Sequence, residues 1–88
     1  MAESSERKYS KIFIGKQVVS KSGKRLGIIS DLVFEVRTGE LLYFVLKQPT
    51  PYAMSLNLEK TKDGDILIPF SAMISSADFV VVAEEDIV

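Results

Sequence analysis

The sequence predicts a small all-β domain. Short apolar runs alternate with glycine-containing turns, and within residues 25–36 apolar side chains occupy five of the six even positions, as in a strand with one buried face. The chain has 88 residues, which is the size of one domain. About five to six short antiparallel strands linked by hairpins favour a small β-barrel, to which the sequence adds one short helical turn.

The first elements follow from composition and from one turn. Residues 1–8 are polar and charged without periodicity, so we expect a flexible tail before a domain over residues 9–88. The first strand is expected over residues 17–19 and ends in a turn at Gly23, where a positive φ has no steric cost. The second strand covers residues 25–36 and turns its even positions inward.

The remaining strands are separated by clear turn signals. A turn over residues 37–40 leads into a third strand over residues 41–46. Residues 52–58 alternate between large apolar and small or polar side chains, which predicts a fourth strand whose pairing the pattern leaves open. Then follow a strand over residues 66–68, a helical turn over residues 72–74 capped by Ser71, and a last strand over residues 79–83.

The third strand is apolar at every position, which is unusual for a strand with one face in water. Its second side is therefore covered either by the closed barrel or by another molecule. If the second side faces outward, it forms an exposed apolar strip, and such strips usually mark a protein interface. The candidate interface residues are Ile29, Val33, Leu41, Tyr43 and Val45.

The net charge of −1 is unevenly distributed. Residues 1–25 carry seven Lys and Arg against two Glu, which gives +5, whereas residues 26–88 carry four basic and ten acidic side chains, which gives −6. This pattern is typical of an ordinary solvated surface, and the alternative is two faces of opposite sign that orient a partner. The basic region contains Tyr9 and Phe13 as its only aromatics, which argues against direct nucleic-acid binding.

The sequence contains no residue pattern that is typical of an active site or a metal site. The chain has no histidine and no cysteine, so it lacks the commonest ligands of zinc and cannot form disulfides. Asp63 and Asp65 flank Gly64 without the further oxygen ligands of a calcium loop, so we expect a turn. We expect no catalytic residues, metal, cofactor or small-molecule substrate. No apolar run approaches the roughly 18 residues that span a bilayer, and the N-terminus lacks the apolar region of a signal peptide, so we expect a cytoplasmic protein without direct membrane insertion.

Five short segments form an ordered set along the chain. They are Gly15-Lys16-x-Val18, Gly23-Lys24-x-x-Gly27-x-x-x-Asp31, Leu42–Leu46, Ile68-Pro69-Phe70-Ser71 and Asp78-x-Val80. This set resembles the PRC-barrel domain family, which is named for the H subunit of the photosynthetic reaction centre and includes the C-terminal half of the ribosome maturation factor RimM. The resemblance covers about residues 10–83 and implies a PRC-type β-barrel.

Stand-alone PRC-barrel domains resemble archaeal adaptors named cell division protein B. The resemblance implies a dimer, formed with a second copy or with a paralogous PRC-barrel protein. It also implies that the dimer links SepF, the membrane anchor of the tubulin-like GTPase FtsZ, to other proteins at the division site. The alternative is a RimM-like role in ribosome or RNA maturation through binding a ribosomal protein. Neither role is enzymatic.

Overall fold

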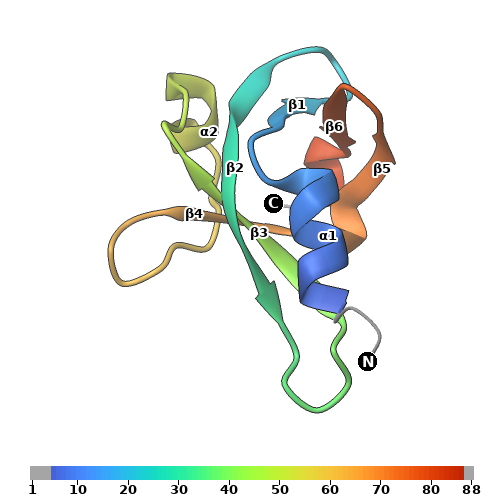
Figure 1. The fold of residues 1–88 in the computed structure, drawn as a ribbon. Coiled ribbons are helices and arrows are strands. Elements are labelled where there is room, and N and C mark those ends of the chain that lie inside the picture. The colour runs from blue at the N-terminus through green and yellow to red at the C-terminus, as the bar shows by residue number, and fades with distance from the viewer. Residues whose placement is uncertain (1–4, 87–88) are drawn as a thin grey trace.

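The computed structural model describes residues 5–86, which form one curved six-stranded sheet with short helices at its margins (Figure 1). The elements are α1 (Ser5–Phe13), β1 (Gln17–Ser20), β2 (Arg25–Phe34), β3 (Leu41–Lys47), α2 (Pro51–Ser55), β4 (Ile66–Pro69), η1 (Phe70–Ala72), β5 (Met73–Ser76), β6 (Phe79–Val82) and η2 (Glu84–Asp86). The strand order is β4-β3-β2-β1-β6-β5. The predicted all-β class is confirmed.

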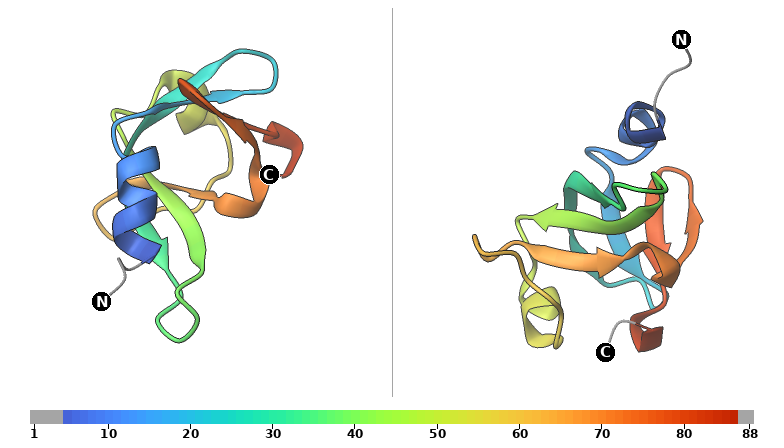
Figure 2. Two further views of the ribbon diagram at one scale, coloured as in Figure 1. Left: turned by 45° about the vertical axis from the view of Figure 1, so that its right-hand side comes forward. Right: turned by 90° about the horizontal axis from the view of Figure 1, so that it is seen from below.

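The sheet curls back on itself without closing (Figure 2). Its edge strands, β4 and β5, are neighbours in the chain, and η1 turns the corner between them. Among the described strands, the expected antiparallel pairing holds except between β1 and β6, which run parallel with Gln17 opposite Phe79. These two strands are not consecutive in the chain, so no hairpin forces them to be antiparallel.

Helix α1 replaces part of the predicted flexible tail. Residues 5–8 of that tail are helical, and residues 1–4 lie outside the described residues. Tyr9 and Phe13 are one helical turn apart and share one face of the helix. The ring of Phe13 is buried, and its centroid lies 5.0 Å from that of Phe44 on β3. The aromatic face of α1 thus explains why the ordered chain begins earlier than the composition suggests.

Helix α2 occupies residues for which the sequence predicts a strand over 52–58, so that prediction is wrong. Thr50 caps the helix, because its hydroxyl oxygen accepts a hydrogen bond of 3.2 Å from the Ala53 N–H. Pro51 at the first helical position has the φ that a helix requires. The Thr50 hydroxyl also donates to the backbone carbonyl of Arg25 at 2.6 Å, which fixes α2 to the start of β2.

The helical turn before β5 lies earlier than predicted. The sequence suggests residues 72–74, whereas η1 covers Phe70–Ala72 and β5 begins at Met73. Pro69, with a φ of −60°, precedes η1 directly and commits the chain to turn at that point. Between α2 and β4 the chain is irregular and approaches the sheet through a bridge of Lys60 to Ile66.

The core lies on the inner face of the curved sheet. Two rows of side chains cross β2, β3 and β4, and all six members are buried. The rows are Ile29–Leu46–Ile66 and Leu32–Phe44–Ile68. Gly27 allows β2 and β3 to approach each other, since a Cβ there would lie 3.0 Å from the Lys47 carbonyl oxygen. The inner rows fix which side chains of the same strands point outward.

Candidate protein-binding surface

The outer face of β2, β3 and β4 carries an apolar strip. Val33 lies opposite Tyr43 and Tyr43 opposite Pro69, while Val45 lies opposite Leu67. Residues opposite each other in a sheet share a face, so these side chains are neighbours. We call the five residues the β2–β4 strip. Four of them are half-buried, and Val45 is 8% exposed but does not belong to the main core cluster.

Three of the five predicted interface residues, Val33, Tyr43 and Val45, lie on this outer face, but Val45 is itself buried and offers a partner little surface. The other two are corrected by the structure, because Ile29 and Leu41 point into the core and are buried. Neither side chain is accessible to a partner in this fold.

Two irregularities in the β2–β3 ladder explain the error. One lies between Ile29 and Asp31, and the other between Val33 and Phe34, which pairs with Leu41. A bulge inserts one residue and shifts the in-and-out alternation by one position. Ile29 therefore faces inward although it occupies an odd position that period two assigns to the outside.

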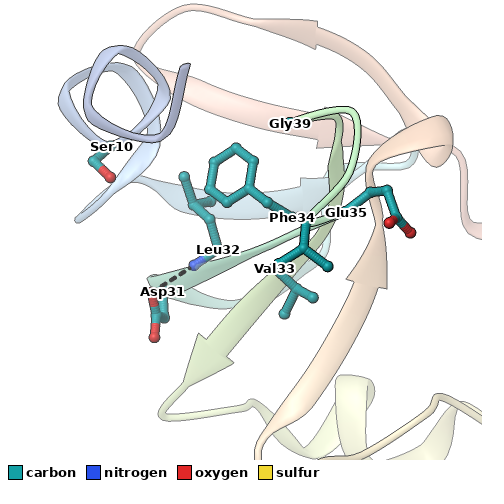
Figure 3. A pocket seen from close by; sticks show the side chains of 8 residues that line it. Ser10, Asp31, Leu32, Val33, Phe34, Glu35 and Gly39 are labelled. Carbon is teal, nitrogen blue, oxygen red and sulfur yellow. Dashed lines mark hydrogen bonds between the residues drawn. The ribbon is translucent and has the colours of Figure 1, made fainter. Parts of the chain in front are cut away.

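Two hollows flank the strip. The first, of about 440 Å³, lies between α1, which contributes Ser10, and the β2–β3 hairpin. Figure 3 shows Val33 between Asp31 and Glu35 along one side of the strand, with Phe34 turned to the other side. The second hollow, of about 400 Å³, lies on the other side of the hairpin and is lined by the start of β3 and by the η1 corner. Val33 lines the first hollow, and Tyr43 and Pro69 line the second, so the strip extends from one depression to the other.

A second apolar patch lies on the outer face of β1, β6 and β5, and the predicted interface does not include it. Phe79 and Ile74 are 51% and 52% exposed, and Val81 lies opposite Val19 with both half-buried. The signal for this patch is present in the sequence, because Phe79–Val82 is apolar at all four positions, as β3 is at six of its seven. Like β3, β6 therefore has apolar side chains on both of its faces.

A polar network ties the C-terminal turn η2 to two other elements. The Glu84 carboxylate accepts hydrogen bonds from the Tyr52 hydroxyl of α2 and from the N–H and hydroxyl of Ser22 between β1 and β2, at 3.2 and 3.1 Å for the latter two. Lys21 pairs with Glu85 at 2.7 Å, and the Lys24 ammonium lies 4.7 Å from the centroid of the Tyr52 ring. The network holds three chain segments together at one end of the molecule.

These contacts shift the pKa values of Tyr52, Glu84 and Glu85 in the directions that stabilise the network. The hydrogen bond from the Tyr52 hydroxyl holds the pKa of the Glu84 carboxyl below its usual value, and Lys21 does the same for Glu85. The hydrogen bond to Glu84, followed by desolvation and the charge of Glu84, raises the pKa of Tyr52. The carboxylates are thus favoured as anions and the phenol as the neutral donor, an arrangement that suits a structural contact.

The acidic side chains of residues 5–86 and the loop around Asp63 were the remaining places for a metal ion. Within this range no three acidic side chains come close enough to hold a metal ion. The segment around Asp63 is the expected turn, with Gly64 at a φ of 88° and the Thr61 N–H donating to the Asp65 carbonyl at 2.8 Å. No helix of the described part has the length and apolar character needed to cross a membrane.

The comparisons with known proteins agree with the fold and with the ordered motifs. A family model described as the PRC-barrel domain matches residues 6–88, which takes in nearly all of α1 and every described strand. No curated protein matches the chain. The matched range is nearly the whole sequence, so the resemblance carried by the ordered motifs is confirmed. The chain belongs to the PRC-barrel domain family.

Proposed function

We propose that this protein is a non-enzymatic adaptor that acts as a dimer, with the β2–β4 strip as its contact surface. The observation that carries the proposal is the row Val33–Tyr43–Pro69, in which three half-exposed side chains lie side by side across three strands. Contiguous apolar surface of this kind usually marks a contact with another molecule. Tyrosine suits such a place, because its ring can be buried while its hydroxyl stays hydrated.

A second copy is a suitable occupant of the strip. In a dimer with two-fold symmetry the same patch lies on both sides of the contact, so each side chain must tolerate its own kind. The strip contains no charged side chain, but Asp31 lies opposite Val45 on the same face, and Lys47 lies beyond the strip on β3. A domain of this size also buries a modest share of its surface by itself, so a partner adds stability. A paralogous PRC-barrel protein could use the same strip.

The biological role within this proposal is that of an adaptor of archaeal cell division. In this role the dimer links SepF, the membrane anchor of FtsZ, to other division proteins. The protein reaches the division site by binding SepF. Two findings support the role: membership of the PRC-barrel family, whose domains are in general not catalytic, and a surface suited to proteins. The direct partner is identified by affinity capture with the tagged protein. Recovery of SepF or a PRC-barrel paralogue supports the division role, and recovery of ribosomal proteins contradicts it.

Light scattering coupled to size-exclusion chromatography tests self-association. At about 100 µM the wild-type protein should have about twice its chain mass of 9.8 kDa. Tyr43→Asp or Val33→Asp should give a monomer, because a buried carboxylate without a partner disfavours the contact strongly. Circular dichroism of both variants should retain the wild-type strand signal.

Met54→Asp is the matched control. Met54 lies on α2, away from the strip, and is 52% exposed, so the same substitution should leave the dimer mass unchanged. A wild-type mass of one chain at this concentration, or dissociation by Met54→Asp as readily as by Tyr43→Asp, would contradict the proposal.

A further inference from the structure

We propose that the outer face of β6, β1 and β2 receives an extended segment of a partner protein that presents an apolar, a hydrogen-bond-donating and an acidic side chain in turn. The inference rests on the proposed adaptor function, since it assigns the chemistry of the partner. It uses none of the residues of the β2–β4 strip, so the two contacts can be tested separately.

Two rows of outward-facing side chains cross this part of the sheet. The rows are Phe79–Gln17–Ile28–Lys47 and Ser75–Val81–Val19–Arg25. Residues opposite each other in a sheet share a face. The intervening residues Val18 and Val80 are fully buried in the core, which shows that the rows point outward. The rows therefore form one surface, which is apolar on β6 and carries Lys47 and Arg25 at its other end.

Gln17 lies in the middle of this surface, between the side chains of Phe79 and Ile28, which cannot donate a hydrogen bond. The side-chain oxygen of Gln17, Oε1, is buried and accepts no hydrogen bond from the described residues. A buried acceptor without a donor is costly to a fold, and native structures keep few of them. The amide lines a hollow of about 160 Å³ on the same face, and its terminal torsion has a broad range, so the oxygen can turn toward a donor placed there. A bound partner would supply that donor.

The hollow beside Gln17 also brings positive charge to this surface. It is lined by β1, by the first half of β2 and by the chain after β3, and its described lining includes Arg25 but no acidic side chain. The Arg25 guanidinium forms no salt bridge with another described residue, and neither does the ammonium of Lys47 at the end of the first row. A carboxylate of a partner would pair with this positive end of the surface.

The apolar end of the surface favours a protein segment. Phe79 is 51% exposed, and Val81 and Val19 lie half-buried beside it in the second row. An apolar side chain of a partner would remove this surface from water. A single-stranded nucleic acid stacks successive bases on several aromatic rings, whereas here one ring is accompanied by two valines, which suits an aliphatic side chain.

The sheet geometry sets the spacing of the three groups. From Phe79 to Arg25 the surface spans two strand spacings and one step of two residues along the strands, a diagonal of about 12 Å. An extended segment covers about 13 Å between its first and fifth residues. A partner whose apolar, donor and acidic residues are two positions apart therefore places them over Phe79, Gln17 and Arg25.

A titration of the full-length, uniformly 15N-labelled protein with a synthetic peptide tests the inference. The probe is the blocked heptapeptide Ser-Leu-Ser-Asn-Ser-Glu-Ser, added to millimolar concentration. We expect shifts of the Gln17 side-chain amide and of the backbone amides of residues 17–19, 25–28 and 79–81, with no shift at Tyr43. A control peptide with Lys in place of Glu should bind several times more weakly, and the oligonucleotide octathymidylate should give no shifts.

Three variants identify the residues responsible. Gln17→Leu removes the unpartnered oxygen, so the free protein should melt at the same or a higher temperature, whereas peptide binding should weaken about fivefold. A structural role of Gln17 would instead lower the melting temperature. Arg25→Gln should weaken binding about threefold, because it removes one exposed ion pair. Its matched control is Arg37→Gln, at an exposed arginine beyond the other end of β2, which should bind as wild type does.

Absence of shifts at millimolar peptide, equal binding of the Lys peptide, or the same shifts with octathymidylate overturns the inference. A lower melting temperature of Gln17→Leu, or unchanged peptide binding by it, also overturns it. Light scattering on the same samples separates this result from the proposed function. A dimer that ignores the peptide contradicts only this surface, a monomer that binds the peptide contradicts only the dimer, and a monomer that ignores it contradicts both.

Discussion

Replacing Phe13 by alanine should destabilise the protein more than an alanine at any other described side chain of α1. The side chain is 3% exposed and meets three aromatic rings, with centroid distances of 5.0 Å to Phe44, 6.0 Å to Tyr9 and 6.3 Å to Phe70. It is the one fully buried apolar anchor among the described side chains of α1. The substitution therefore empties the contact that holds α1 against the sheet.

The expected cost follows from the burial. Buried Phe→Ala changes cost about 3–5 kcal/mol. A terminal helix can relax into the space, so we expect the low end, about 3 kcal/mol. A domain of this length has a total stability of roughly 4–13 kcal/mol, and each kcal/mol corresponds to about 4–8 °C in melting temperature. Phe13→Ala should thus lower the melting temperature by roughly 12–24 °C.

Urea denaturation followed by circular dichroism measures the change, with Ile12→Ala as the matched control. Ile12 is the preceding residue of the same helix but is 38% exposed, so its replacement should cost less than about 1 kcal/mol. A cost for Phe13→Ala that equals the cost of Ile12→Ala would refute the account of α1 as part of the core.

Three further substitutions test the local architecture. Thr50→Ala should cost about 1 kcal/mol in denaturation, since α2 loses its cap and the bond to the Arg25 carbonyl; retention of full stability would contradict this role. Gly27→Ala should cost about 1–3 kcal/mol, because a Cβ would meet the Lys47 carbonyl oxygen at 3.0 Å, and an unchanged urea midpoint would show that β2 and β3 separate freely. Glu84→Gln should flatten the pH dependence of the melting temperature. The lowered pKa of Glu84 means that its contribution is complete above its ordinary value of 4.5 and is lost as the pH falls below that value. The raised pKa of Tyr52 means that the contribution of the phenol is complete below pH 10.0 and is lost as the pH rises further. If the melting temperatures of wild type and Glu84→Gln fall equally as the pH is lowered, the network is not the source of the acid sensitivity.

Local patterns predict most of the strands well, because each of these is bounded by a turn with a physical cause. They miss β5 (Met73–Ser76), where the sequence predicts a helical turn over residues 72–74. The runs over residues 17–19, 41–46, 66–68 and 79–83 each match an observed strand within one residue at either end. The strand predicted over residues 52–58 is wrong, because the alternation of apolar side chains there competes with a stronger local signal. Thr50 and Pro51 form a capped helix start, and that chemistry overrides a period of two.

The candidate surface is harder to predict, since it depends on which side chains of each strand point outward. One inserted residue near Ser30 exchanges the faces of Ile28 and Ile29, and period two alone does not locate a bulge. The parallel pairing of β1 with β6 is also invisible locally, because it joins the two ends of the domain. Val33, Tyr43 and Val45 are correctly grouped, since they lie between the two irregularities of the β2–β3 ladder.

In the proposed dimer the β2–β4 strip, and not the patch around Phe79, forms the contact between copies. The most direct test is a dilution series of the 15N-labelled protein from about 1 mM to about 10 µM, followed by amide shifts residue by residue. If the strip forms the contact, concentration-dependent shifts are expected at Val33, Tyr43 and Leu67, with none at Ile74 or Phe79. Shifts confined to Ile74 and Phe79 would contradict it.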